Sequence, residues 1–253
     1  MSRNILTGLV GAWCPSLGPS GYTLLDRSGR GNHGTLTNMD AGSDWVGMPG
    51  GWALDFDGTN DSVIITTRAI PIITNFTLYG WAYRTAGTSN RNIIGIGSGA
   101  TGFWTLYWQS ASGRYTAEGW DLSNNVAISE TTNPGLNVWT QVVMSASAGL
   151  FRIYTDGILR ASATNTHSQT AQTVITIGNL SGYSSWFQGD LDDLACWNRG
   201  ITAGEVLQLY QLGRGGLGRL LTRRAQRRVF RTATAAKSYL FVNRGQVIGG
   251  GTL

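Results

Sequence analysis

The chain has 253 residues with 36 glycines and only five prolines, and no apolar run approaches the ~20 residues of a membrane span. Ser, Thr and Asn are plentiful and helix-period apolar patterns are nearly absent, which favours an all-β protein with many turns over an α or α/β protein. Two cysteines, Cys14 and Cys196, exclude a disulfide scaffold, and no CxxC or His-rich tract indicates zinc.

Charge divides the chain into two parts. Residues 1–212 hold ten arginines and all 14 acidic residues, whereas residues 213–253 hold eight arginines, one lysine and no acidic residue. This asymmetry predicts an acidic domain at 1–212, followed by a glycine hinge at 213–218 and a basic C-terminal arm. The N-terminus lacks the apolar core and cleavage site of a signal peptide, so we expect synthesis in the cytoplasm without export.

The first half of the domain contains strand patterns, one glycine-rich loop and one hairpin turn. Gly8–Trp13 predicts a first strand, and the glycine-rich segment Leu25–Leu36 predicts a tight loop. Asp57-Gly58 lies between two alternating runs and predicts a hairpin turn. Phe76–Arg84 alternates, which places Phe76, Leu78, Gly80 and Ala82 on one face and Thr77, Tyr79, Trp81 and Tyr83 on the other.

The second half continues as strands and ends in one helix. Asp156-Gly157 predicts a turn between two strands, and Thr202 and Glu205 have the spacing of a capping box, so a helix should start near Ala203. The expected strands lie at residues 92–96, 103–109, 114–119, 139–146, 150–154, 159–163 and 173–178, followed by one in the closing segment that begins at Gln188.

Five of these segments, in this order, resemble laminin-G-like domains of the concanavalin A-like lectin/glucanase class. They are D-R-S-G-R-G-N-H-G from Asp26, L-D-F-D-G-T-N-D-S-V from Leu54, F-T-L-Y-G-W from Phe76, R-I-Y-T-D-G from Arg152 and G-D-L-D-D-L from Gly189. The resemblance covers residues 6–212 and implies a jelly roll of two antiparallel sheets packed face to face. It also implies that His33 is a buried, hydrogen-bonded structural residue.

The resemblance implies a cation site, since such folds often carry one cation on the rim of the sandwich. Calcium prefers many oxygen ligands, and Asp26, Asp192 and Asp193 are the candidates for holding it. The alternative is that these aspartates cap turns through backbone N–H groups.

Ten tryptophans and nine tyrosines indicate either a large core or a glycan-binding surface. Tyr183 and Trp186, in the segment Ser-Gly-Tyr-Ser-Ser-Trp, are the best candidates for exposed glycan-binding residues, and Trp81 and Tyr79 are further candidates. Core packing is the competing interpretation for each.

The sequence argues against an enzyme. Glucanases of this fold class use two glutamates on one strand, and this chain has only Glu118, Glu130 and Glu205, which are widely separated. No nucleophile motif or phosphate loop is present. We therefore predict a non-enzymatic protein, with a glycan-cleaving enzyme as the least favoured alternative.

The basic arm predicts attachment to a partner. Its arginines suit carboxylate or phosphate partners, and they comprise Arg219, Arg223, Arg224, Arg227, Arg228 and Arg231. With the G-L-V-G-A-W-C-P opening, the arm resembles laminin-G-like proteins of tailed bacteriophages, which implies a virion surface component: a capsid decoration or tail accessory protein. We expect the arm to bind a capsid protein or to form homo-oligomers, and the domain to display a lectin-like surface for cell-surface glycans. Nucleic acid is not the expected partner, because the arm lacks a recognised motif, and a free-standing glycan-binding module is the alternative function.

Overall fold

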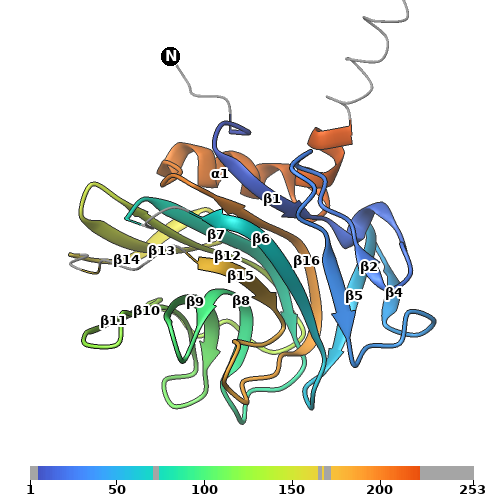
Figure 1. Cartoon of the computed structure of the whole chain (residues 1–253), viewed down its shortest axis with the longest axis horizontal. Coiled ribbons are helices and arrows are strands. Elements are labelled where there is room, and N and C mark those ends of the chain that lie inside the picture. Colours follow the sequence, from blue (N-terminus) through green and yellow to red (C-terminus); the bar gives the residue numbers. More distant parts are fainter. Residues whose placement is uncertain (1–4, 71–73, 165–166, 168–171, 223–253) are drawn as a thin grey trace, which may run out of the picture. The chain divides into compact units, whose positions relative to one another are not determined.

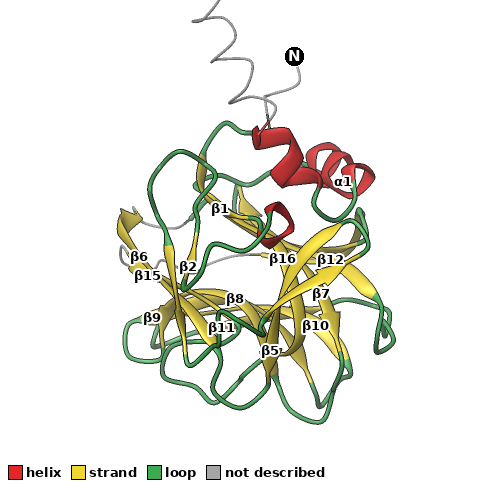
Figure 2. Ribbon diagram, turned by 90° about the vertical axis from the view of Figure 1, so that its right-hand side faces the viewer, coloured by secondary structure: helices red, strands yellow, loops and turns green. Residues whose placement is uncertain are grey.

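The computed structural model describes residues 5–70, 74–164, 167 and 172–222. In these residues the chain forms two antiparallel sheets of eight strands each, which confirms the predicted all-β jelly roll. Figure 1 shows the strands curving across each other in two layers. Figure 2 shows that helix α1 (Ala203–Leu212), drawn in red, lies on one side of them.

The first sheet, sheet A, is centred on the last strand of the fold. Its strand order is β14 (Ile158–Thr164), β13 (Leu150–Thr155), β12 (Trp139–Ser147), β7 (Phe76–Arg84), β16 (Gln188–Trp197), β5 (Gly51–Asp57) and β4 (Trp45–Met48). The eighth strand, β1 (Leu9–Trp13), pairs with the second half of β16, while β5 pairs with its first half.

The second sheet, sheet B, packs against sheet A. Its order is β11 (Asn125–Ser129), β10 (Arg114–Trp120), β9 (Gly102–Gln109), β8 (Arg91–Ser98), β15 (Gln172–Ile177), β6 (Ser62–Ile70), β3 (Gly34–Thr37) and β2 (Thr23–Leu24). Strand β3 overlaps the end of the segment Leu25–Leu36, which was predicted to be a tight loop.

The core lies between the sheets and follows the predicted alternation. On β7, Phe76, Leu78 and Ala82 belong to the core, whereas Thr77 and Tyr79 point to the opposite face of sheet A. On β9, the core residues are likewise every second one, which leaves the intervening side chains on the outer face of sheet B.

One of the two Asp-Gly turns was interpreted wrongly. Asp156-Gly157 joins β13 to β14 as a hairpin, as predicted. Asp57-Gly58 does not form a hairpin, because β5 belongs to sheet A and β6 to sheet B. This turn carries the chain across the sandwich, and Asp57 stabilises it by accepting from the N–H of Thr59 at 2.7 Å.

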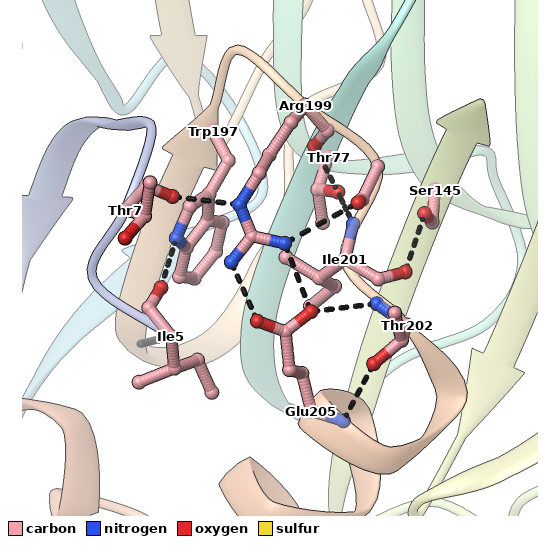
Figure 3. A network of polar contacts seen from close by, with 10 residues as sticks. Ile5, Thr7, Thr77, Ser145, Trp197, Arg199, Ile201, Thr202 and Glu205 are labelled. Carbon is pink, nitrogen blue, oxygen red and sulfur yellow. Dashed lines mark hydrogen bonds and ion pairs between the residues drawn. The ribbon is translucent and has the colours of Figure 1, made fainter. Parts of the chain in front are cut away.

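Helix α1 (Ala203–Leu212) begins where the capping box predicts. Thr202 accepts from the N–H of Glu205 at 3.2 Å, and the Glu205 carboxylate accepts from the N–H of Thr202 at 2.8 Å. Arg199 forms a bidentate ion pair with Glu205, with N···O distances of 2.6 and 2.8 Å (Figure 3). The turn between β16 and α1 is therefore fixed by the side chains that start the helix.

Both cysteines are buried free thiols. Strands β1 and β16 pair, but Cys196 lies opposite Gly11, and Cys14 lies past Trp13, whose partner is Leu194. The two cysteines are therefore offset along the strands rather than facing each other. Burial raises the pKa of Cys196 to about 12, so this thiol is protonated at neutral pH.

Two adjacent buried carboxylates interrupt β16. The pairing of β16 with β7 shifts register between Asp192 and Ala195, and Asp193 has a φ of 47° in the left-handed region. Both aspartates have 0% exposed surface. The N–H of Ser16, in the 3₁₀ helix η1 (Pro15–Leu17), donates to Asp192 at 3.0 Å.

Arg214 neutralises this acidic bulge. Its Nη1 lies 2.9 Å from Oδ2 of Asp192 and 3.1 Å from the carbonyl oxygen of Trp52, and Nη2 donates to the carbonyl of Pro49. The guanidinium carbon lies 4.7 Å from the centre of the Trp139 ring. Burial and the charge of Asp193 raise the pKa of Asp192, and Arg214 opposes that rise.

The segment 213–218 is part of the jelly roll and not the predicted hinge. The N–H groups of Leu217 and Gly218 donate to the Asp193 carboxylate at 3.0 and 3.3 Å. The first compact unit accordingly ends at Gly218, and the second comprises residues 219–253, of which residues 219–222 are described and are helical. The boundary lies six residues beyond the predicted one.

We expect Arg214→Ala to lower the free energy of unfolding by about 3–5 kcal/mol, because it leaves two buried carboxylates without their cation. Arg30→Ala, which removes an exposed arginine, should change it by less than about 0.5 kcal/mol. Urea denaturation of the three proteins measures both effects, and equal midpoints for all three would show that the bulge needs no countercharge.

Candidate functional site

Two of the four predicted glycan-binding aromatic residues are buried under the helix, so that prediction was wrong for Tyr79 and Trp81. Tyr79 has 0% exposed surface and packs edge-on against Trp197. Trp81 donates to the Tyr79 hydroxyl at 2.8 Å and stacks on Tyr210 of α1 at 6.0 Å. Trp81 is covered by α1 and Tyr79 packs against β16, so both serve packing.

The other two aromatic residues lie in the loop between β15 and β16, as expected. Tyr183 is 42% exposed, and its ring meets that of Phe103 edge-on at 5.5 Å. Trp186 is half-buried, and its carbonyl accepts from Arg91 at 2.8 Å. Only Tyr183 of this pair lines the cavity described next.

A cavity of about 280 Å³ lies on the outer face of sheet B. Strands β8, β9 and β10 form its base, and the loop between β15 and β16 forms one wall. The lining residues are Asn90, Asn92, Phe103, Thr105, Tyr107, Glu118, Leu180, Tyr183 and Ser185. This volume is close to the lower end of the range for small-molecule pockets, about 300–1,000 Å³.

Asn92 is the most deeply buried polar residue of the cavity, with 1% exposed surface. Its backbone N–H donates to the carbonyl of Ser185 at 2.8 Å, which ties the loop to β8. Its side-chain oxygen accepts from the Thr105 hydroxyl. Its Nδ2 has no hydrogen-bond partner, and leaving a buried donor unpaired costs about 1–3 kcal/mol.

Glu118 supplies the negative charge of the cavity. Asn125 on β11 donates to its carboxylate at 2.7 Å. Burial raises the pKa of Tyr107, and the charge of Glu118 with a hydrogen bond to it adds to the rise. Burial, followed by the same charge, raises the pKa of Tyr183. The carboxylate therefore acts on the two tyrosines that line the cavity.

Aromatic rings form the apolar part of the site. Phe103 lies between two of them, with Tyr183 at 5.5 Å and Trp120 at 5.8 Å between ring centres. An apolar surface beside convergent polar groups is the usual composition of a small-ligand site.

Asp26, one of the predicted cation ligands, is a turn residue. Its carboxylate accepts from the N–H groups of Ala12 at 3.0 Å, Ser28 at 2.8 Å and Asn32 at 3.0 Å. Its own N–H donates to Nδ1 of His33 at 3.0 Å. His33 is hydrogen-bonded as expected, but it is exposed rather than buried.

Asp192 and Asp193 likewise face donors. Their oxygens accept from Arg214 and from backbone N–H groups, whereas a calcium site needs oxygen atoms around the cation. Within the described part of the chain, no three His, Cys, Asp or Glu residues come together to hold a metal ion. Turn capping therefore accounts for Asp26, whereas Asp192 and Asp193 are held by Arg214 and by backbone N–H groups of distant segments, and calcium binding stays a prediction.

A calcium titration decides between these two interpretations. If the aspartates serve the turns, millimolar calcium and EDTA should leave the melting temperature of metal-free protein unchanged. If calcium binds the folded state alone, 100-fold excess over Kd should stabilise it by about 2.7 kcal/mol, and the melting temperature should rise.

The predicted arm falls largely outside the described residues. Arg219 is exposed and lies in the helical residues 219–222. Arg223, Arg224, Arg227, Arg228 and Arg231 lie outside the described part. No helix within that part is long and apolar enough to cross a membrane.

Of the nine residues that line the cavity, only Tyr183 was predicted to bind glycan, and the other eight were missed at the level of sequence. Strict alternation of Phe103, Thr105 and Tyr107 with the core residues of β9 was a usable signal, because it places these three on the outer face. No signal pointed to Asn92, since a bulge between Asn92 and Ile94 sets its direction.

The comparisons with known proteins agree with this architecture. The family model of the concanavalin A-like lectin/glucanases superfamily matches residues 57–207. A search of curated proteins found no match.

Solved structures share the fold at low sequence identity. Domain 4 of AbnA, an extracellular GH43 arabinanase from Geobacillus stearothermophilus solved with arabinotriose, has a TM-score of 0.67 and 16% identity, over 80% of this chain and 98% of that one. The binding domain of Paraclostridial Mosquitocidal Protein 1 has a TM-score of 0.65 and 13% identity, over 82% and 52%. Trypanosoma rangeli sialidase has a TM-score of 0.59 and 16% identity, over 81% and 33%.

Proposed function

Because the chain belongs to the concanavalin A-like lectin/glucanase superfamily, we propose that its jelly roll is a glycan-binding module with its site in the cavity on sheet B. A cavity lined by both a carboxylate and aromatic rings is the observation that carries the proposal.

The surrounding groups suit a sugar. Sugar rings carry hydroxyls around an apolar face, and the cavity offers Glu118 as an acceptor, Thr105 as a hydroxyl group and the rings of Phe103 and Tyr183. The fold neighbour solved with arabinotriose supports an oligosaccharide as the ligand class.

We propose that the module binds and does not cleave its glycan. Glycoside hydrolysis needs two carboxyl groups about 5–9.5 Å apart, and Glu118 is the one carboxylate that lines the cavity. Glu130 accepts from the N–H of Tyr115 at 2.9 Å, and Glu205 caps α1, so both other glutamates have structural partners.

Tyr183→Ala should weaken glycan binding about five- to tenfold, because it removes an exposed ring from the wall of the cavity. Tyr22→Ala is the matched control: Tyr22 is 61% exposed and does not line the cavity. Binding to a glycan array measures both, and equal losses for the two variants would place the site elsewhere.

We further propose that the module is displayed on a virion, as a capsid decoration or tail accessory protein, with the basic residues beyond Gly218 as its anchor. Residues 219–253 carry seven arginines, one lysine and no acidic residue. Ion pairs and hydrogen bonds with carboxylates or phosphates would therefore stabilise them. A capsid protein surface or a second copy of the chain supplies such groups. The alternative is a free-standing glycan-binding module.

Two truncations test the arm. Deletion of residues 219–253 should leave a folded jelly roll that no longer attaches to particles or self-associates. Deletion of residues 213–253 also removes Arg214 and the N–H donors of Leu217 and Gly218, so it should destabilise the fold as well.

Co-sedimentation with particles and analytical ultracentrifugation, each at low and high salt, measure these effects. Attachment by the wild-type chain should fall as salt rises, because the Debye length is only about 8 Å at physiological ionic strength. Full attachment by the protein that ends at Gly218 would show that the anchor lies on the jelly roll.

A further inference from the structure

We infer that the cavity selects uncharged sugars and rejects those that carry a carboxylate or a sulfate. This inference rests on the proposed glycan-binding function and concerns the charge of the ligand. Its basis is the charge balance of the site: one carboxylate, Glu118, and no cationic side chain among the residues that line the cavity.

Glu118 has no cation to offset it within the cavity. The neutral amide of Asn125 donates to its carboxylate at 2.7 Å, and its negative charge contributes to the raised pKa values of Tyr107 and Tyr183. An anionic sugar placed here would meet a carboxylate of like charge in a partly desolvated site, where repulsion is stronger than in water.

The arginine next to Asn92 in sequence has its hydrogen bonds outside the cavity. Arg91 precedes Asn92 on β8, so its side chain starts on the opposite face of the strand. Its guanidinium donates to the carbonyls of Gly58 and Trp186 and to the side-chain oxygen of Gln188, at 3.2, 2.8 and 3.0 Å. Recognition of carboxylates and sulfates ordinarily uses such a guanidinium in the site itself.

The donors and acceptors that remain match sugar hydroxyls. The Thr105 and Tyr107 hydroxyls can pair with sugar hydroxyls. The Glu118 carboxylate accepts hydrogen bonds, so it pairs with ligand hydroxyl or N–H groups. An uncharged sugar satisfies these groups, whereas a ligand carboxylate or sulfate is repelled by Glu118.

The test is a glycan array built from matched pairs. Each pair holds a neutral glycan and the same glycan with a terminal sialic acid, or an oligogalacturonate and its methyl ester. We expect the wild-type chain to bind the neutral member of its preferred pair at least tenfold more tightly, which corresponds to about 1.4 kcal/mol.

Glu118→Gln isolates the charge, since the amide keeps the shape of the side chain. It should bring the two members of the pair within about threefold of each other. Asp40→Asn removes one negative charge from an exposed residue outside the cavity and should leave the tenfold preference intact.

The outcomes separate the two claims. Equal or tighter binding of the anionic member by the wild-type chain overturns the charge selectivity and leaves glycan binding standing. An unchanged preference in a folded Glu118→Gln protein also overturns it. No binding to any member of the array overturns both. If Glu118→Gln does not fold, the wild-type preference alone decides, because it needs no variant.

Discussion

The fold depends on the acidic bulge in the middle of β16. Two adjacent aspartates without exposed surface can stay in a protein interior only if other groups neutralise and hydrogen-bond them. Those groups come from η1 and from residues 214–218, which flank the sheet from opposite ends of the sequence. The bulge thereby joins the start and the end of the jelly roll to its central strand.

The segments before and after β16 lie on different faces of the jelly roll. Helix α1 follows β16 and covers the outer face of sheet A, where Trp81 and Tyr210 stack. The loop that precedes β16 instead forms a wall of the cavity on the outer face of sheet B, tied to β8 by the hydrogen bond from Asn92 to Ser185. One face is thus closed by packing, and the other keeps a polar hollow with an unpaired donor.

Local patterns were enough to predict the architecture but not the site. The alternation of side chains along Phe76–Arg84 predicted the two faces of β7, and the Thr202–Glu205 spacing predicted the start of α1. Both features are set by residues that are neighbours in sequence. The predicted exposure of Trp81 and the predicted hairpin at Asp57-Gly58 were wrong, because a distant helix and the partner sheet decide them. The role of Arg214 could not be predicted either, since its carboxylate partner lies 22 residues away on another element.

The side-chain amide of Asn92 offers the most direct test of glycan binding in the cavity on sheet B, because this residue lines the cavity. Nuclear magnetic resonance of ¹⁵N-labelled protein would follow this amide during titration with an oligosaccharide that the protein binds. We predict that the Asn92 Nδ2 signals shift as the sugar fills the cavity that this residue lines, while the indole signal of Trp81 under α1 stays in place. Shifts at Trp81 with an unchanged Asn92 amide would show that the glycan binds elsewhere.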